Sequence, residues 1–139
     1  MPYPLEEHIV TRATLLVGLT FLLLALTSSP VALAAGNLRG DEVRALISGK
    51  RIYLATPFGS ELPLTYHADG SLDGEAPGLV KLVQKSDTGS WWISGDRMCQ
   101  KWRNWYDGKT YCFALTLTDA SHFIWHRNDG FSGRGRVAN

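Results

Sequence analysis

The sequence predicts an all-β domain, in which an antiparallel meander of about eight short strands closes into a small barrel or folds into a sandwich, with one short N-terminal helix. Three observations predict this fold. From residue 50 onward, short segments alternate apolar and polar residues, as half-buried strands do. The dipeptide Asp-Gly, a strong hairpin signal, occurs four times, each near a strand end. No long crossover separates the segments, so consecutive strands are expected to pair in antiparallel order.

Residues 1–34 are predicted to be a secretory signal peptide that lies outside this domain. The stretch Leu15–Leu26 is apolar throughout, and a Thr-Ser-Ser-Pro breaker and the small-x-small motif Ala32–Ala34 follow it. A membrane span needs about 20 apolar residues, so cleavage before Ala35 is expected, with an uncleaved anchor as the alternative. Two glutamates before Arg12 do not suit a positive n-region. Translation from Val10, through a GTG start, would remove them.

The helix is expected over Gly40–Gly49, at the start of a single β-rich domain that covers residues 35–139. Asp41 can cap its N-terminus, and the final glycine can end it. Apolar residues at positions 43, 46 and 47 share one face, which is typical of a helix that packs against a core.

Eight strands are expected after this helix. Alternate residues of one segment, from Leu62 to Ala68, fall on a single face, as in a strand with one buried side. Turns are expected at the Asp-Gly pairs 69–70, 73–74, 107–108 and 129–130. The expected strands are Arg51–Ala55, Leu62–Ala68, Leu79–Val83, Trp91–Ser94, Arg97–Arg103, Thr110–Thr118, His122–Arg127 and Arg134–Ala138.

The two cysteines, Cys99 and Cys112, are predicted to form a disulfide. A zinc site would need C-x-x-C pairs or further ligands at short spacing, and a thioredoxin-like site would need C-x-x-C; both are absent. The cysteines fall on strands that flank a predicted hairpin, and lone cysteines pair in an oxidising compartment. Closing a loop of about 14 residues stabilises a fold by about 3 kcal/mol in the chain-entropy model.

Five tryptophans follow the signal segment. Trp91 and Trp92 are adjacent on one strand and must point to opposite faces. Trp102 and Trp125 are expected in the core, because large rings fill small domains efficiently. Trp92, Trp105 and Tyr106 form a candidate aromatic surface that could bind a glycan or a protein. For the two tryptophans of this surface, burial in the core is the alternative.

Catalytic and metal-binding residues are not predicted. Asp69, Asp73 and Glu75 could supply a carboxylate pair or Ca²⁺ ligands, but their spacing lacks the D-x-D-x-D-G pattern, and Asp beside Gly is typical of turns. His122 and His126 share a strand face without an evident third ligand, which favours a solvent-exposed face. No nucleophile motif of the G-x-S-x-G type is present, and no cofactor is expected.

The charge balance argues against a nucleic-acid partner. Positions 35–139 carry 13 Lys and Arg against 11 Asp and Glu, which is far from the basic stripe that nucleic acids require. Arg127, Arg134 and Arg136 near the C-terminus suggest either an anion-binding face or a charged edge strand that discourages strand pairing.

The run from Gly89 to Trp102, GSWWISGDRMCQKW, with Tyr111-Cys112 after it, resembles a family of small exported proteins of rhizobia and other alphaproteobacteria. Segments 48–50, 66–70 and 129–130 fit the same pattern, so the resemblance covers residues 41–137. The family is a domain of unknown function, and it implies export and a β-rich fold without catalytic residues. The doubled tryptophan and the Trp-Tyr-Asp-Gly loop at 105–108 depart from the pattern.

The expected function is that of a non-catalytic binding or interaction module of the cell envelope, periplasmic or secreted, whose partner is an envelope protein or glycan. A narrower form is an inhibitor of a secreted hydrolase, by fold-level analogy. Two alternatives stay open: a glycan hydrolase that uses carboxylates near Asp69 and Asp73, and a lipocalin-like carrier of small apolar ligands. Membrane contact is expected only through an uncleaved signal segment.

Overall fold

The structure of the protein is a computed structural model that describes residues 36–76 and 85–139. The predicted signal peptide with its alternative start at Val10, and the predicted strand Leu79–Val83, lie outside the described residues. Within them, no helix is both long enough and apolar enough to cross a membrane.

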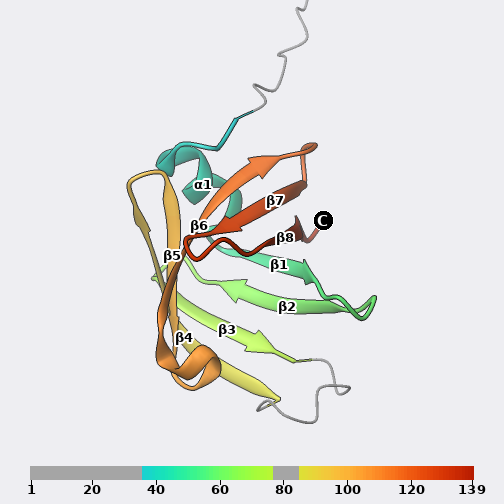
Figure 1. The fold of residues 1–139 in the computed structure, drawn as a ribbon. Coiled ribbons are helices and arrows are strands. Elements are labelled where there is room, and N and C mark those ends of the chain that lie inside the picture. The colour runs from blue at the N-terminus through green and yellow to red at the C-terminus, as the bar shows by residue number, and fades with distance from the viewer. Residues whose placement is uncertain (1–35, 77–84) are drawn as a thin grey trace, which may run out of the picture. The chain divides into compact units, whose positions relative to one another are not determined.

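Eight antiparallel strands form a closed barrel in chain order, as Figure 1 shows, and one short helix precedes them. β8 closes the barrel by pairing with β1, where Leu54 lies opposite Gly135. The predicted all-β meander with one helix is therefore confirmed, and it closes as a barrel. The elements are α1 (Gly40–Ile47), β1 (Lys50–Ala55), β2 (Glu61–Tyr66), β3 (Ser71–Glu75), β4 (Ser86–Ser94), β5 (Arg97–Trp102), η1 (Trp105–Gly108), β6 (Thr110–Leu117), β7 (His122–Arg127) and β8 (Ser132–Val137).

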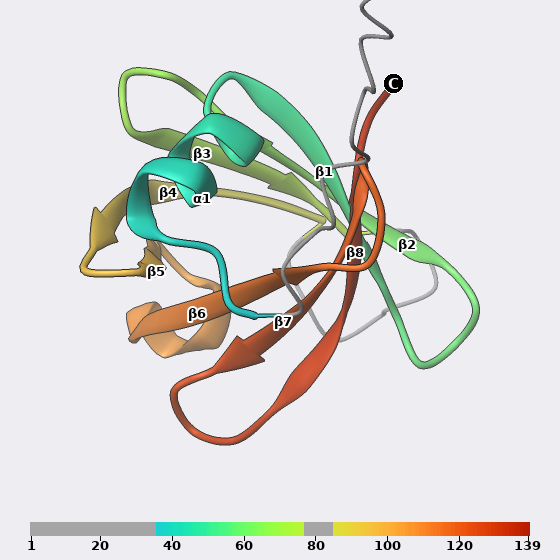
Figure 2. The ribbon, with the colours of Figure 1, turned by 90° about the horizontal axis from the view of Figure 1, so that it is seen from above.

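Helix α1 lies at one end of the barrel, beside the turn between β2 and β3 (Figure 2). It buries Val43 and Ile47 against the barrel core. The prediction that Asp41 caps this helix is wrong. Asp96, in the turn between β4 and β5, accepts a hydrogen bond from the backbone N–H of Gly40 at 2.9 Å, so a distant turn supplies the acceptor.

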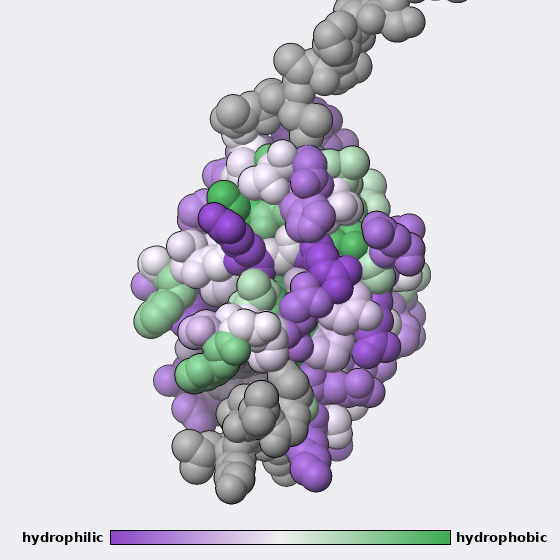
Figure 3. Space-filling view, turned by 90° about the vertical axis from the view of Figure 1, so that its right-hand side faces the viewer, coloured by the Kyte–Doolittle hydropathy of each residue, from purple (hydrophilic) through white to green (hydrophobic). Residues whose placement is uncertain are grey.

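Side chains from the strands fill the barrel interior, together with residues of α1 and η1. Trp91 is buried, whereas its neighbour Trp92 is 38% exposed, which confirms that the two rings point to opposite faces. The surface is predominantly hydrophilic, with small hydrophobic patches, on the face shown in Figure 3. The buried core consists of Val43, Ile47, Ile52, Leu64, Tyr66, Leu72, Trp91, Met98, Trp102, Trp105, Phe113, Leu115 and Phe123.

Strand β3 replaces a predicted turn. The pair Asp73-Gly74 does not reverse the chain; Gly74 lies mid-strand on the inner face, opposite Leu64 of β2 and Asp87 of β4. The physical reason is that aromatic rings occupy the space that a side chain at this position would take. The other Asp-Gly pairs do lie in turns or loops, where their glycines, Gly70, Gly108 and Gly130, have positive φ angles.

Candidate functional site

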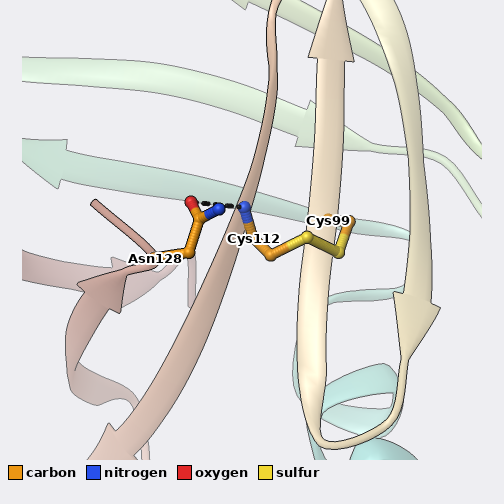
Figure 4. The surroundings of a disulfide bond; sticks show 3 residues. All are labelled: Cys99, Cys112 and Asn128. Atoms are coloured by element: carbon orange, nitrogen blue, oxygen red, sulfur yellow. Dashed lines mark hydrogen bonds between the residues drawn. A yellow bond between two sulfur atoms is a disulfide. The ribbon is translucent and has the colours of Figure 1, made fainter. Parts of the chain in front are cut away.

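The predicted disulfide is present. Cys99 of β5 and Cys112 of β6 are directly opposite each other, with Cα atoms 4.0 Å apart, and they form the bond shown in Figure 4. The backbone N–H of Cys112 donates to Oδ1 of Asn128 at 3.3 Å, and the N–H of Asn128 donates to the Cys112 carbonyl at 2.9 Å. The disulfide and these hydrogen bonds connect β5 and β6 to the turn that precedes β8. A disulfide of this kind fits a non-cytoplasmic protein.

The three residues of the predicted aromatic surface do not lie together. Trp105 is only 6% exposed, so its predicted role as a surface residue is wrong. Its ring packs on Trp102 inside the barrel, with centroids 4.7 Å apart. Trp92 lies on the outer wall, opposite Cys99 and close to the turn at the α1 end. Tyr106 is 46% exposed and lies in η1, at the other end.

Exposed aromatic side chains instead lie on three separate loops at the end of the barrel away from α1. In an up-and-down barrel, the connections β1–β2, β5–β6 and β7–β8 all lie at one end. These loops carry Phe58, Tyr106 and Phe131, which are 81%, 46% and 64% exposed. We call the three loops that carry these residues the aromatic loops. The sequence did not predict Phe58 and Phe131 as site residues. Each lies beside a glycine, a residue typical of hairpin turns, and a single Phe in a turn is the only indication that the sequence provides.

Arg127 links this end of the barrel to its interior. It faces inward on β7, opposite the buried Phe113, and its Nε and one terminal nitrogen donate to the two carboxylate oxygens of Asp129 at 2.7 and 2.8 Å. Its guanidinium lies over the rings of Tyr111 at 4.3 Å and Phe131 at 4.8 Å. The ion pair with Asp129 raises the pKa of Arg127.

The prediction of a charged edge strand is wrong in the barrel, because β8 pairs with both β7 and β1. Arg136 of β8 points to the outer face, where it donates to both carboxylate oxygens of Glu61 at 2.8 and 2.6 Å. Arg127 and Arg136 thus form the same type of ion pair on opposite faces of the sheet.

Asp87 fixes the loop that carries η1. It is 6% exposed and accepts hydrogen bonds from the backbone N–H groups of Trp105 at 2.7 Å, Asn104 at 2.8 Å and Thr88 at 2.9 Å. Burial alone raises the pKa of this carboxyl, but the hydrogen bonds outweigh it and lower the pKa from its ordinary value. The carboxylate therefore stays ionised and holds the loop against β4.

Within η1, Tyr106 and Asp107 are non-glycine residues in the left-handed region, with φ angles of 55° and 57°. This conformation is costly for side-chain-bearing residues and persists only where surrounding contacts enforce it. Two sets of contacts enforce it here. The start of the loop is hydrogen-bonded to Asp87, and the rings of Tyr106 and Tyr111 pack edge-on with centroids 5.7 Å apart.

Among the cavities that the described residues line, two small ones lie in the barrel interior. One, of about 20 Å³, lies next to Ile47 of α1 and Tyr66. The other, of about 30 Å³, is lined by Trp102, Trp125 and Arg127 among others, and we call it the Trp102–Trp125 cavity. Each has room for only a few atoms, so side chains fill most of the barrel, as is usual with eight strands.

Two buried side-chain polar atoms in the described part of the chain have no hydrogen-bond partner, Nε1 of Trp102 and Nε1 of Trp125. Both rings line the Trp102–Trp125 cavity. An indole N–H is a donor only, and leaving such a donor unsatisfied in the interior costs about 1–3 kcal/mol. By contrast, the hydroxyl of Tyr66 donates to Oε1 of Gln100 at 2.8 Å in the same interior.

The carboxylates considered for catalysis lie on exposed positions and line neither interior cavity. Asp69 accepts hydrogen bonds from the hydroxyl and the backbone N–H of Ser71, which lower its pKa and mark a turn-forming role. Oδ2 of Asp73 is 2.6 Å from Nε2 of His67. Glu75 forms a surface ion pair.

The histidines of β7 are both exposed. His122 contacts Asp119, with 2.9 Å between Nδ1 and Oδ1. Ile124, which shares the strand face of the two histidines, is half-buried. Residues 36–76 and 85–139 contain no group of three His, Cys, Asp or Glu side chains that could hold a metal ion.

Comparisons with family models, with curated proteins and with solved structures found no match to this chain. The resemblance to the exported alphaproteobacterial family therefore stays a prediction.

Proposed function

We propose that this protein is a non-catalytic binding module of the cell envelope, which contacts a partner protein through Phe58, Tyr106 and Phe131 of the aromatic loops. One observation carries the proposal. Of the four large hydrophobic side chains exposed in the described residues, three lie on these loops and only Trp92 lies elsewhere. Three exposed aromatic side chains at the same end of the barrel favour an interaction site at that end, whereas isolated ones are ordinary.

The chemistry of this end of the barrel suits a protein partner. Interface hot spots are rich in Trp, Tyr and Arg and often combine an aromatic ring with a cation. Here Arg127 lies over the ring of Phe131, and Tyr106 packs edge-on against Tyr111. These contacts hold two of the three aromatic groups in place before binding, so less conformational entropy is lost when a partner docks.

Export to the periplasm or the exterior is part of the proposal. The disulfide between Cys99 and Cys112 and the signal-like sequence of positions 1–34 both support it. The narrower proposal of a hydrolase inhibitor is supported by loops that project from a closed, disulfide-bonded barrel. A glycan hydrolase is less well supported, because Asp69 is engaged in a turn and Asp73 contacts His67 on the outer surface.

Site-specific cross-linking tests this proposal. A photo-reactive phenylalanine at position 58 or 131 should give a discrete adduct in an extract of the cell envelope, and the same group at Arg97, an exposed position next to the α1-end turn, should not. Equal labelling from all three positions, or from none, would contradict the proposed surface.

Binding of the purified partner then gives the quantitative test. Phe58→Ser and Phe131→Ser should each weaken binding at least about tenfold, the usual effect of removing an interface anchor. Trp92→Ser is the matched control, because it removes an exposed aromatic ring from the barrel wall. If only the Trp92 variant loses binding, the contact surface is the wall and the proposal is wrong. Inhibition of an isolated hydrolase, lost in the same Phe variants, would establish the narrower form.

A further inference from the structure

We propose that the Trp102–Trp125 cavity binds a carboxylate group, either that of a small carboxylic acid or the end group of a longer one. This site shares Tyr106 with the aromatic loops, but it does not depend on a partner protein. The starting observation is that Trp102 and Trp125 both line this cavity and that each has a buried indole N–H without an acceptor among the described residues. Most buried donors in folded proteins are paired, so two orphans beside one cavity indicate an acceptor that enters it.

The missing acceptor should have two oxygens and a negative charge. A carboxylate can accept from both indole groups at once, one at each oxygen. Arg127 lines the same cavity and brings a guanidinium that stays charged at any physiological pH. Asp129 accepts from Nε and one terminal nitrogen of that guanidinium, which orients the cation and leaves its other N–H groups available to a ligand.

Apart from Gln100 and Tyr106, the rest of the lining is apolar. Leu54, Leu62 and Leu64, from β1 and β2, form one wall of the cavity. A volume of about 30 Å³ accommodates a carboxylate but not a long hydrocarbon chain. The methyl or methylene group next to the carboxylate would contact the leucine wall, and a longer chain would have to leave through the loop end.

Tyr106 is the residue at which such a ligand would enter. It lines the cavity and is also 46% exposed, so its ring lies between the cavity and solvent. Its backbone is in the left-handed region, a conformation that is often found at sites that must rearrange or hold a ligand. Rotation of the Tyr106 side chain would open the cavity without disturbing the barrel strands.

The test is an NMR titration of the oxidised protein labelled with ¹⁵N, in which indole N–H signals are followed as ligand is added. Sodium acetate should shift the signals of Trp102 and Trp125, which Trp→Phe variants identify, and leave the signal of Trp92 unchanged. Sodium decanoate presents the same carboxylate at the end of a long hydrocarbon chain, and decanol presents that chain without the carboxylate. Shifts with either carboxylate but not with decanol support the proposal. No shift with either carboxylate, or equal shifts with decanol, overturns it.

Two arginine variants separate a carboxylate site from a general change in the barrel. Arg127→Gln should raise the acetate dissociation constant at least about tenfold, the loss expected when a charged partner of a buried anion is removed. Arg136→Gln is the matched control, since Arg136 forms the same two-bond ion pair, with Glu61, on the outer face. Unfolding midpoints of both variants show whether they fold. Equal weakening in the two variants, or none in Arg127→Gln, would also overturn the proposal.

Discussion

The indole ring of Trp105 lies directly against the backbone of Gly74. A Cβ atom added to Gly74 would be 2.5 Å from Cζ3 of Trp105 and 2.7 Å from Cη2 of Trp102, both well inside van der Waals contact. The absence of a side chain at one position of β3 is therefore what admits two tryptophan rings to this part of the barrel. Trp105 in turn brings the start of η1 into the interior and leaves Tyr106 at its rim.

Gly74→Ala should destabilise the protein by about 1–3 kcal/mol, the usual cost of overpacking a filled core. This direction is the reverse of the general trend, because alanine is normally better than glycine in a strand interior. Urea denaturation followed by tryptophan fluorescence measures the change. Glu75→Ala, the exposed next residue of the same strand, is the control and should change stability by less than about 0.5 kcal/mol. A neutral or stabilising Gly74→Ala would show that the rings do not depend on this glycine.

The same contact shows why β3 could not be predicted. Asp73-Gly74 has the local chemistry of a turn, and three other Asp-Gly pairs of this chain do lie in turns or loops. What distinguishes Gly74 is the ring of Trp105, which is distant along the chain, and no local pattern reports it. Trp105 was assigned to the surface for the same reason, since a residue between two strands is usually exposed.

Other parts of the fold could be predicted because their causes are local. Alternation of apolar residues indicated six of the eight strands to within about two residues at each end, and β7 was predicted with its full bounds. The disulfide followed from two cysteines placed symmetrically about a loop. The Trp102–Trp125 cavity and the pairing of Asp87 with η1 depend on side chains from elements that are far apart in the chain, so spacing in the sequence could not indicate them.

Removal of the disulfide should lower the free energy of unfolding by about 3 kcal/mol, because the reduced chain regains the entropy of a loop of about 14 residues. The double variant Cys99→Ala/Cys112→Ala measures this loss by urea denaturation. Reductant should lower the midpoint of the natural protein to near that of the variant and leave the variant itself unchanged. Two free thiols in protein isolated from outside the cytoplasm would contradict both the bond and the proposed location.

Asp87→Ala should destabilise the protein by about 3 kcal/mol, since it removes the charged acceptor of the buried backbone N–H of Trp105 and of the partly buried N–H of Asn104. Loss of this carboxylate should also make the free energy of unfolding fall less steeply at acidic pH. The pKa of Asp87 is lower in the folded than in the unfolded state, so its contribution is complete above an unfolded value of about 3.9 and falls as the pH drops below it.

The measurement is the free energy of unfolding from pH 7 to pH 2.5, and Asp87→Asn should flatten its fall with acidity. Asp41→Asn, at an exposed position on α1, controls for the loss of one carboxylate and should keep the natural slope. An unchanged slope in Asp87→Asn would mean that this carboxylate is not the group that couples η1 to pH.

Tyr66 should behave as a titratable group that resists ionisation until the barrel opens. Burial raises the pKa of Tyr66 above its ordinary value, and its hydroxyl donates to Oε1 of Gln100 only while it is protonated. Because the folded pKa lies above the unfolded value of about 10, the contribution of Tyr66 to stability is complete below pH 10 and is lost as the pH rises further.

Tyr66→Phe should cost about 1–2 kcal/mol at pH 7, since it leaves a buried acceptor unpaired, and should reduce the loss of stability above pH 10. Tyrosinate absorbance in the near ultraviolet, recorded beside unfolding curves at each pH, checks both expectations, with Tyr53→Phe on the outer wall as the control. Ionisation of Tyr66 in the intact barrel near pH 10 would show that this hydroxyl is in contact with solvent and that the interior around Gln100 is more open than the structure indicates.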